Sequence, residues 1–192
     1  VFEMVPKTFF PDSDRNQFLI YVDLPAGSSS RETDRVVREV TGWLGDKAAN
    51  PDIESAVGYS GDGGPRFYLS LSPIDPNPNR GFVTANTVDY QAVDGAIAQT
   101  RAYIAEAFPE ARGRVKKMWL GSTEAGLVEV RLESPDAERL YNEAAAVQEA
   151  FLNIPGTLNV DSDWENKILK VRIDVDQAQA QRAGNGGRRF QI

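Results

Sequence analysis

The first 120 residues alternate between segments with the apolar spacing of strands and segments with that of helices. Residues 18–24 are rich in β-branched and aromatic side chains and end at a Pro-Ala-Gly turn, which predicts a strand. Ser29 followed by Glu32 has capping-box spacing, so we expect a helix to begin there and to stop at Asn50-Pro51. Four apolar residues share one face of this helix: Val36, Val40, Trp43 and Leu44.

A β-hairpin and a second helix are predicted next. Residues 53–59 and 66–72 have strand composition, and Gly61 to Pro65 between them has the composition of a hairpin turn. Residues 73–80 contain three prolines and are expected to form an extended connector. An amphipathic helix is predicted from about residue 87 to 108, before a strand at 112–120. Its apolar face consists of Val93, Ile97, Ile104 and Phe108.

This order, β-α-β-β-α-β, predicts an α+β fold: a ferredoxin-like sandwich with helices on one face of an antiparallel sheet. The pattern then starts again with an alternating strand at 127–132 and Ser134-Pro135 as helix cap and first helical residue. The next helix has Leu140, Ala144, Val147 and Phe151 on one face. Strands are predicted at 157–161 and 168–175, and a further helix at 176–184.

The chain is therefore expected to contain two subdomains, the second of them incomplete. We place the first at residues 15–120 and the second at 121–184, with a leader at 1–14 and a Gly-rich linker and tail at 185–192. A second copy without its final strand leaves an unpaired sheet edge, which folded proteins usually avoid. The second subdomain is thus predicted to be truncated, or to be completed by residues 188–192.

Composition removes most catalytic chemistry from consideration. The chain has neither cysteine nor histidine, which excludes cysteine nucleophiles, histidine bases and zinc sites built on either residue. A net charge of −7 disfavours unselective binding to nucleic acid. No apolar segment approaches the ~18 residues of a membrane span, and the N-terminus lacks signal-peptide features. Because the chain begins at Val1 instead of Met, we expect it to be an excised part of a longer protein.

The remaining polar motifs favour structural roles. Ser28 to Ser30 fit helix capping, and Asp174 with Asp176 fits a solvated strand edge. Gly61 to Gly64 joins two predicted strands, whereas phosphate-binding loops run from a strand into a helix. The basic run 112–117 fits a charged edge strand, although contact with an anion or nucleic acid is an alternative. No catalytic residue, metal site or cofactor is predicted.

One alternative is an RNA-recognition-like module. Residues 19–25 and 66–69 loosely echo the aromatic strands of RNA-recognition domains, which have the same β-α-β-β-α-β order. The glycine pattern of those domains is missing, and the chain is acidic.

Five sequence segments occur in order along the chain: residues 9–18, residues 22–29, the Gly-rich turn with Pro65-Arg66-Phe67, residues 155–157 and residues 173–184. These segments resemble the periplasmic region of resistance–nodulation–division (RND) efflux transporters. Together they extend over about residues 5 to 184. The resemblance implies the loop after the seventh membrane helix, with the first C-terminal porter subdomain and part of the second. It implies that the leader follows a membrane helix and that the docking-domain insertion of the family is absent.

The resemblance also implies partners and location. Such pumps are proton-driven homotrimers in the bacterial inner membrane that work with a periplasmic adaptor and an outer-membrane channel. This region would be their periplasmic part, and we expect the fragment alone to be monomeric or weakly associated. Metal-exporting members use methionine clusters, whereas this chain has only Met4 and Met118, so small amphiphilic organic substrates are expected. A non-transporting RND-like assembly protein is the second alternative.

The predicted substrate site is the hairpin tip from Gly58 to Phe67, beside a groove between the two subdomains. In related pumps the matching hairpin is a switch loop between two drug pockets, and three closely spaced glycines give it conformational freedom. An ordinary surface turn, with Tyr59 in the core, is the simpler alternative. The candidate substrate-binding residues are Tyr59, Ser60, Gly61, Asp62, Gly63, Gly64, Pro65, Arg66 and Phe67, with Leu19, Met118 and Trp119 as groove wall.

Overall fold

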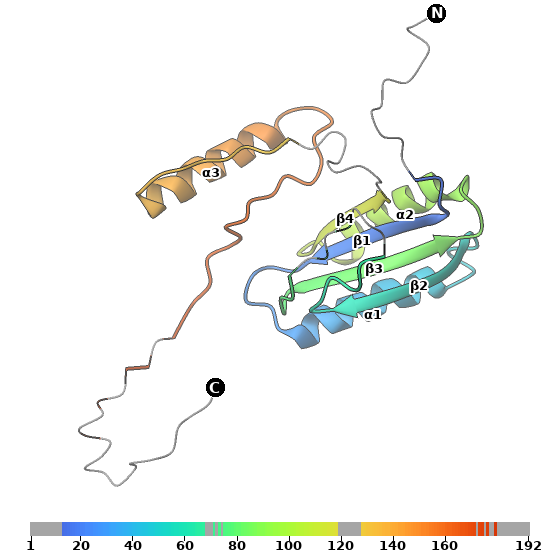
Figure 1. Cartoon of the computed structure of the whole chain (residues 1–192), viewed down its shortest axis with the longest axis horizontal. Helices are drawn as coiled ribbons and strands as arrows, with labels where there is room; N and C mark the ends of the chain where they lie inside the picture. The colour runs from blue at the N-terminus through green and yellow to red at the C-terminus, as the bar shows by residue number, and fades with distance from the viewer. Residues whose placement is uncertain are drawn as a thin grey trace, which may run out of the picture.

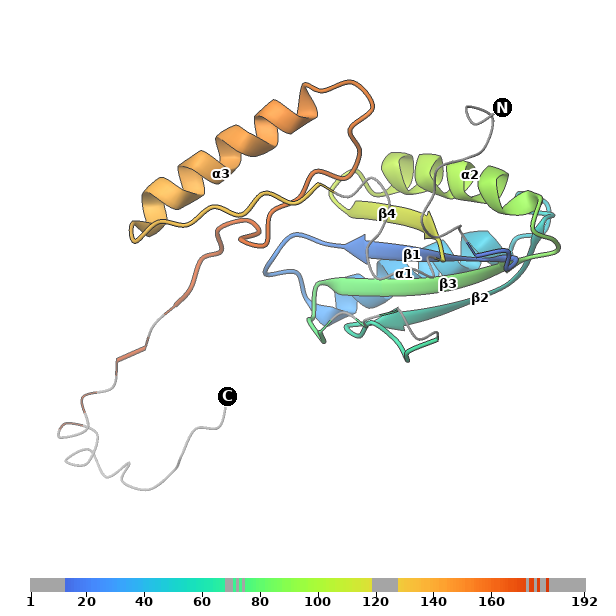
Figure 2. The ribbon, with the colours of Figure 1, turned by 45° about the horizontal axis from the view of Figure 1, so that its top comes forward.

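A four-stranded antiparallel sheet with two helices on one face forms the ordered centre of the computed structural model, which describes residues 13–67, 71, 73, 75–118, 128–171, 173–174, 176 and 179 (Figure 1). The strands are β1 (Gln17–Asp23), β2 (Ile53–Ser60), β3 (Arg80–Thr87) and β4 (Arg112–Lys117), in the spatial order β2-β3-β1-β4. Helices α1 (Ser30–Gly45) and α2 (Ala92–Ala107) cover the same face (Figure 2). The predicted α+β, ferredoxin-like fold is confirmed.

The main core lies between the sheet and these two helices. Phe18, Ile20 and Val22 point inward from the central strand β1 and are fully buried. The predicted apolar faces of both helices meet them, with Val36, Val40 and Leu44 from α1 and Val93, Ile97 and Ile104 from α2. The Oγ of Ser29 accepts a 3.2 Å hydrogen bond from the backbone N of Glu32, as the capping-box spacing predicts.

The hairpin prediction is wrong in its second strand. β2 pairs with β3 at residues 80–87, and the backbone N of Gly61 donates to the carbonyl of Arg80 at 2.7 Å. Residues 66 and 67 are not in a strand, and 68–70 and 72 lie outside the described residues. The strand beside β2 must leave room for α1, because a Cβ at Gly58 or Gly81 would lie 2.5 Å from Val37. The pattern of apolar residues does not reveal that β3 needs a glycine beneath Val37.

The second half of the chain forms only one of its predicted elements among the described residues. Helix α3 (Ala137–Leu152) is present, but its N-cap is Asp136, whose Oδ1 accepts from the backbone N of Glu138 and Arg139. Ser134 therefore is not the cap; its Oγ accepts from the N of Asp136 instead. The described residues within 127–132, 157–161 and 168–175 contain no strand, which corrects three predictions.

The missing strands have a common physical reason. A strand needs hydrogen-bonded neighbours and a buried face, and the described part of residues 128–174 supplies neither. All sixteen residues of α3 are described, and none is buried. Large apolar side chains stay exposed instead, including Leu152, Leu158, Leu169, Val171 and Ile173.

The predicted boundaries of the two subdomains stay predictions. The proposed junction near residue 121, the leader up to residue 12 and the tail at 185–192 lie outside the described residues, as does most of the helix predicted at 176–184. Within the described ranges, no helix has both the length and the apolarity needed to cross a lipid bilayer.

Candidate functional site

A row of aromatic side chains crosses the sheet on the face away from α1 and α2. In the strand register Tyr59 lies opposite Phe82, Phe82 opposite Tyr21, and Tyr21 opposite Arg114. One residue from each of the four strands therefore lies in one line across the sheet. Because side chains alternate between the two faces of a strand, the inward neighbours Val22 and Val83 belong to the main core.

This row belongs to a second apolar cluster, which we call the aromatic face. It consists of Leu19, Tyr21, Leu71, Phe82 and Met118, with Tyr59 and Phe67 packed against it. The ring centroids of Tyr59, Phe67 and Phe82 are 6.0–6.2 Å apart, and those of Tyr21 and Phe82 are 5.1 Å apart. These separations are typical of favourable aromatic contacts.

The structure thus brings together four apolar residues that the sequence analysis singled out, namely Leu19, Tyr59, Phe67 and Met118. Trp119 lies outside the described residues. The sequence analysis missed Tyr21, Leu71 and Phe82. The composition of residues 18–24 predicted β1 but did not show which of its two faces the helices would cover. Phe82 belongs to the strand that was not predicted.

The glycine-rich tip lies on the aromatic face. Gly61 and Gly64 have φ of 72° and 68°, in the left-handed region that glycine adopts most readily. A Cβ at Gly64 would lie 3.1 Å from the ring of Tyr59 and 3.2 Å from that of Phe82. The backbone N of Gly64 donates to Oδ1 of Asp62 at 3.0 Å, which tightens the turn. The tip is therefore fitted to the aromatic rings below it.

The other predicted tip residues surround this contact. Ser60 ends β2 and donates from Oγ to Oδ1 of Asp34 at 3.3 Å. A hydrogen bond from Arg38 holds the pKa of Asp34 below its ordinary value, so this carboxylate accepts at neutral pH. Gly63 is buried, whereas Pro65 and Arg66 are exposed.

Cations border the aromatic face along β4. The guanidinium of Arg114 lies 4.5 Å from the ring centroid of Tyr21, and the ammonium of Lys116 lies 5.4 Å from it. Both distances fall within the range of cation–π attraction. The buried atoms Oγ1 of Thr84 and Nε of Arg114 have no hydrogen-bond partner in the described structure. The aromatic face therefore combines apolar side chains that are mostly buried with polar groups at its border.

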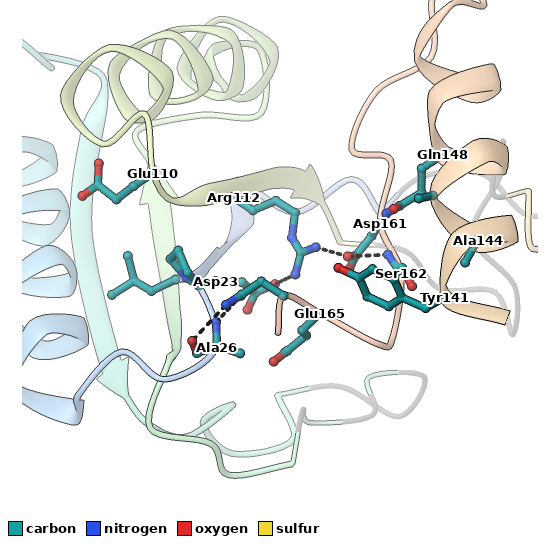
Figure 3. A pocket seen from close by; sticks show the side chains of 14 residues that line it. Asp23, Ala26, Glu110, Arg112, Tyr141, Ala144, Gln148, Asp161, Ser162 and Glu165 are labelled. Atoms are coloured by element: carbon teal, nitrogen blue, oxygen red, sulfur yellow. Dashed lines mark hydrogen bonds and ion pairs between the residues drawn. The ribbon is translucent and has the colours of Figure 1, made fainter. Parts of the chain in front are cut away.

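A second candidate is a cleft of about 390 Å³ between the end of β1, the start of β4 and helix α3 (Figure 3). Acidic groups predominate in it: four carboxylates face a single cation, Arg112, and one ring, that of Tyr141. The lining residues are Asp23, Leu24, Pro25, Ala26, Glu110, Arg112, Tyr141, Ala144, Ala145, Gln148, Asp161, Ser162, Glu165 and Asn166.

The cleft lies between the sheet and α3, and residues 58–67 do not line it. Its lining residues were not predicted as a site. Arg112 was noted only as part of a basic run, and the loop around Asp161 was assigned to a strand. The role of the tip and the groove wall in binding substrate stays a prediction.

The polar groups of the cleft are four carboxylates, the guanidinium of Arg112, two side-chain amides and the hydroxyls of Tyr141 and Ser162. Within the described ranges, no three acidic, histidine or cysteine side chains are grouped in a way that could hold a metal ion. Both arrangements are suited to binding.

The family profile of the AcrB/AcrD/AcrF proteins matches residues 1–186. The chain belongs to this family. It is 26% identical over 193 residues to the multidrug resistance protein MdtC of Pantoea ananatis (strain AJ13355), and the match covers 96% of this chain and 17% of that protein. The resemblance to RND transporters is thereby confirmed for the chain, which corresponds to about a sixth of the relative's length.

A likeness to a solved structure adds little to this membership. Protein SO0527 from Shewanella oneidensis is 13% identical, with a TM-score of 0.36, and the match covers 57% of this chain and 95% of that one.

Proposed function

We propose that this member of the AcrB/AcrD/AcrF family is the periplasmic porter part of a proton-driven RND efflux pump that exports amphiphilic organic compounds. In this proposal the aromatic face and the tip above it bind substrate. The tip residues from Tyr59 to Phe67 then control access to that surface, with Leu19, Met118 and Trp119 beside it. The chain has no enzymatic role in the proposal.

The observation that carries this proposal is the contact between the glycine tip and the aromatic face. Binding sites for amphiphiles are lined by apolar and aromatic side chains with few polar groups. The aromatic face has that character: Tyr21 packs with Phe82, Tyr59 and Phe67 in one apolar cluster, and Arg114 and Lys116 lie against the ring of Tyr21. Gly61 and Gly64 give the covering segment backbone conformations that most other residues strain to adopt.

The expected cargo follows from the same surface. Met118 is buried in the aromatic face, 1% exposed, beside rings and not beside other metal-binding side chains. Soft metal ions need several sulfur or imidazole ligands, and the sequence has two methionines, no cysteine and no histidine. These features favour organic substrates over metal ions. The relative MdtC is a multidrug resistance protein, which agrees with that choice.

The proposed setting is the periplasmic side of the bacterial inner membrane. There the parent protein would assemble as a homotrimer with an adaptor and an outer-membrane channel. An RNA-binding role has less support, because the chain carries a net charge of −7 and lacks the glycine pattern of RNA-recognition domains. A porter region that binds no substrate is the remaining alternative.

The experiment is export by the full parent pump in cells lacking their other RND pumps. Phe67→Ala removes a ring from the aromatic face, whereas Tyr90→Ala removes a partly exposed ring outside it. Loss of one large apolar contact is worth about 1.5–3 kcal/mol, so substrate affinity should fall roughly tenfold or more with Phe67→Ala. Tyr90→Ala should leave export unchanged.

Two results would contradict the proposal. One is unchanged export of every amphiphilic dye by Phe67→Ala at normal protein level. The other is equal loss of export by both variants, because the effect would then not depend on the aromatic face. A parent protein that exports no compound in any form would support the assembly alternative.

A further inference from the structure

The second half of the chain is attached to the sheet mainly by polar contacts. Helix α3 buries no residue, so it has no core of its own to hold it in place. The segment from Asp161 to Asn166 nevertheless returns to the sheet and contacts it at three points: ion pairs to two strand residues, and a pair of hydrogen bonds to Ala26 in the turn after β1, drawn partly in Figure 3. These contacts lie at the edge of the cleft.

The first contact is an ion pair shared by three residues. Arg112, at the start of β4, pairs with Asp161 of the returning segment and lies 3.7 Å from the carboxylate of Asp23 on β1. Asp23 and Arg112 are also opposite each other in the strand register. The sheet therefore holds the guanidinium in position, and Asp161 is the partner that can leave.

The second and third contacts flank this ion pair. Arg80 of β3 pairs with Glu165 at 3.3 Å. The side-chain amide of Asn166 makes a two-way contact with Ala26: its Oδ1 accepts from the backbone N at 2.7 Å, and its Nδ2 donates to the carbonyl at 3.2 Å. Beside them, Cγ2 of Ile168 lies 3.2 Å from the Cβ position of Gly27.

We infer that Asp161, Glu165 and Asn166, with their partners Arg112, Arg80 and Ala26, form a polar latch that sets how far the cleft is open. Charged contacts that are partly exposed weaken as salt screens them, whereas apolar burial does not. A docking held by such contacts is therefore reversible at little cost, which suits a cleft that must admit and release a ligand. Only this last consequence rests on the proposed function; the latch itself does not.

The chain lends itself to a direct distance measurement. It has no native cysteine, so spin labels can be attached at Ala98→Cys on α2 and Asn142→Cys on α3, both exposed positions. Pulsed electron resonance then reports the distribution of distances between the two halves. In the otherwise unmodified chain we expect one narrow peak at 0.1 M salt and a broader, longer distribution at 1 M salt, where the screening length falls from about 10 Å to about 3 Å.

Charge reversal separates the latch from general effects of charge. Glu165→Arg should broaden the distribution at low salt, and adding Arg80→Glu should restore the narrow peak because the pair is re-formed with opposite polarity. Asp163→Arg changes the charge of the same segment by the same amount, at an exposed residue that makes none of the latch contacts, and should leave the peak narrow.

The inference is overturned if the peak stays narrow with Glu165→Arg and at 1 M salt, since apolar contacts would then hold the two halves. It is equally overturned if the unmodified chain gives a broad distribution at low salt, or if Asp163→Arg acts like Glu165→Arg. None of these results depends on transport. The prediction that Phe67→Ala reduces export can therefore be confirmed or contradicted independently of the latch.

Discussion

Helices α1 and α3 have the same length and similar caps but different environments. Each has sixteen residues and begins at a side chain that accepts from backbone N–H groups, Ser29 for α1 and Asp136 for α3. Helix α1 buries Thr33, Val36, Val37, Val40 and Leu44 against the sheet, whereas α3 buries none of its residues. Local sequence thus accounts for both helices, but only α1 packs on the sheet and so belongs to a cooperative core.

The same contrast applies to the whole chain. Among the described residues, 17–118 contain all four strands and nearly all buried side chains, and those from 128 onward contain one helix and exposed apolar side chains. The first region should therefore unfold as a unit, while the second should lose structure at lower cost.

The largest expected difference comes from removing one large side chain from each region. Phe18→Ala empties a fully buried position in the main core and should cost about 3–5 kcal/mol of unfolding free energy. Leu152→Ala acts on a side chain that is 69% exposed and should cost less than about 0.5 kcal/mol. Urea unfolding followed by circular dichroism measures both. Similar costs for the two variants would mean that α3 belongs to a core.

Within the first region, two glycine substitutions compare a tightly packed position with an open one. Gly81→Ala places a Cβ 2.5 Å from Val37 and should destabilise by about 1–3 kcal/mol. Gly42→Ala lies in α1 with no atom within 4 Å of its Cβ position, so it should stabilise by about 0.5–1 kcal/mol through helix propensity. The two changes should therefore shift the thermal midpoint in opposite directions. A shift of the same sign would contradict the packing of α1 on β3.

Cap removal should distinguish a helix in a core from one outside it. Ser29→Ala and Asp136→Ala each remove a helix cap worth about 1 kcal/mol. We expect Ser29→Ala to lower the urea midpoint of the whole first region. Asp136→Ala should only speed amide hydrogen exchange within α3 and leave that midpoint unchanged. Coupling of Asp136→Ala to the global midpoint would show that the two regions unfold together.

The smallest effect concerns alkaline pH. Burial, and secondarily the charge of Glu39, raise the pKa of Tyr103 above its ordinary value of 10.0. A group with a raised pKa in the folded state contributes stability that is complete below the unfolded pKa and is lost as pH rises through the folded pKa. Stability of the first region should thus decline above about pH 10. Tyr103→Phe should reduce that decline in urea unfolding at pH 9 and 11, and an identical decline would contradict it.

Sequence patterns predicted most of the first region because its local and tertiary preferences agree. The cap at Ser29, the apolar faces of both helices and strands β1, β2 and β4 all follow from composition and spacing. Strand β3 could not be predicted in that way. Its inward residues Gly81, Val83 and Ala85 are small and fit beneath α1, whereas residues 66–72 have the more strand-like composition.

The candidate site was predictable only in part. One short segment contains Tyr59, Gly61 to Gly64 and Phe67, so its composition alone identified these residues as candidates. Tyr21 and Phe82 join them through strand register, which depends on the pairing of β1 with β3. In the second half, the alternation at 127–132 is real, but alternation yields a strand only where a neighbouring strand is present.

Binding of an amphiphilic, environment-sensitive dye by the 192-residue chain is the most direct test that the aromatic face is a substrate surface. Dye fluorescence gives saturation, and the amide resonances of the isotope-labelled chain locate the bound dye. The account predicts saturable binding with shifted resonances at Leu19, Tyr59 and Gly64 and little change in α3. No saturable binding, or shifts confined to residues outside the aromatic face and its tip, would contradict it.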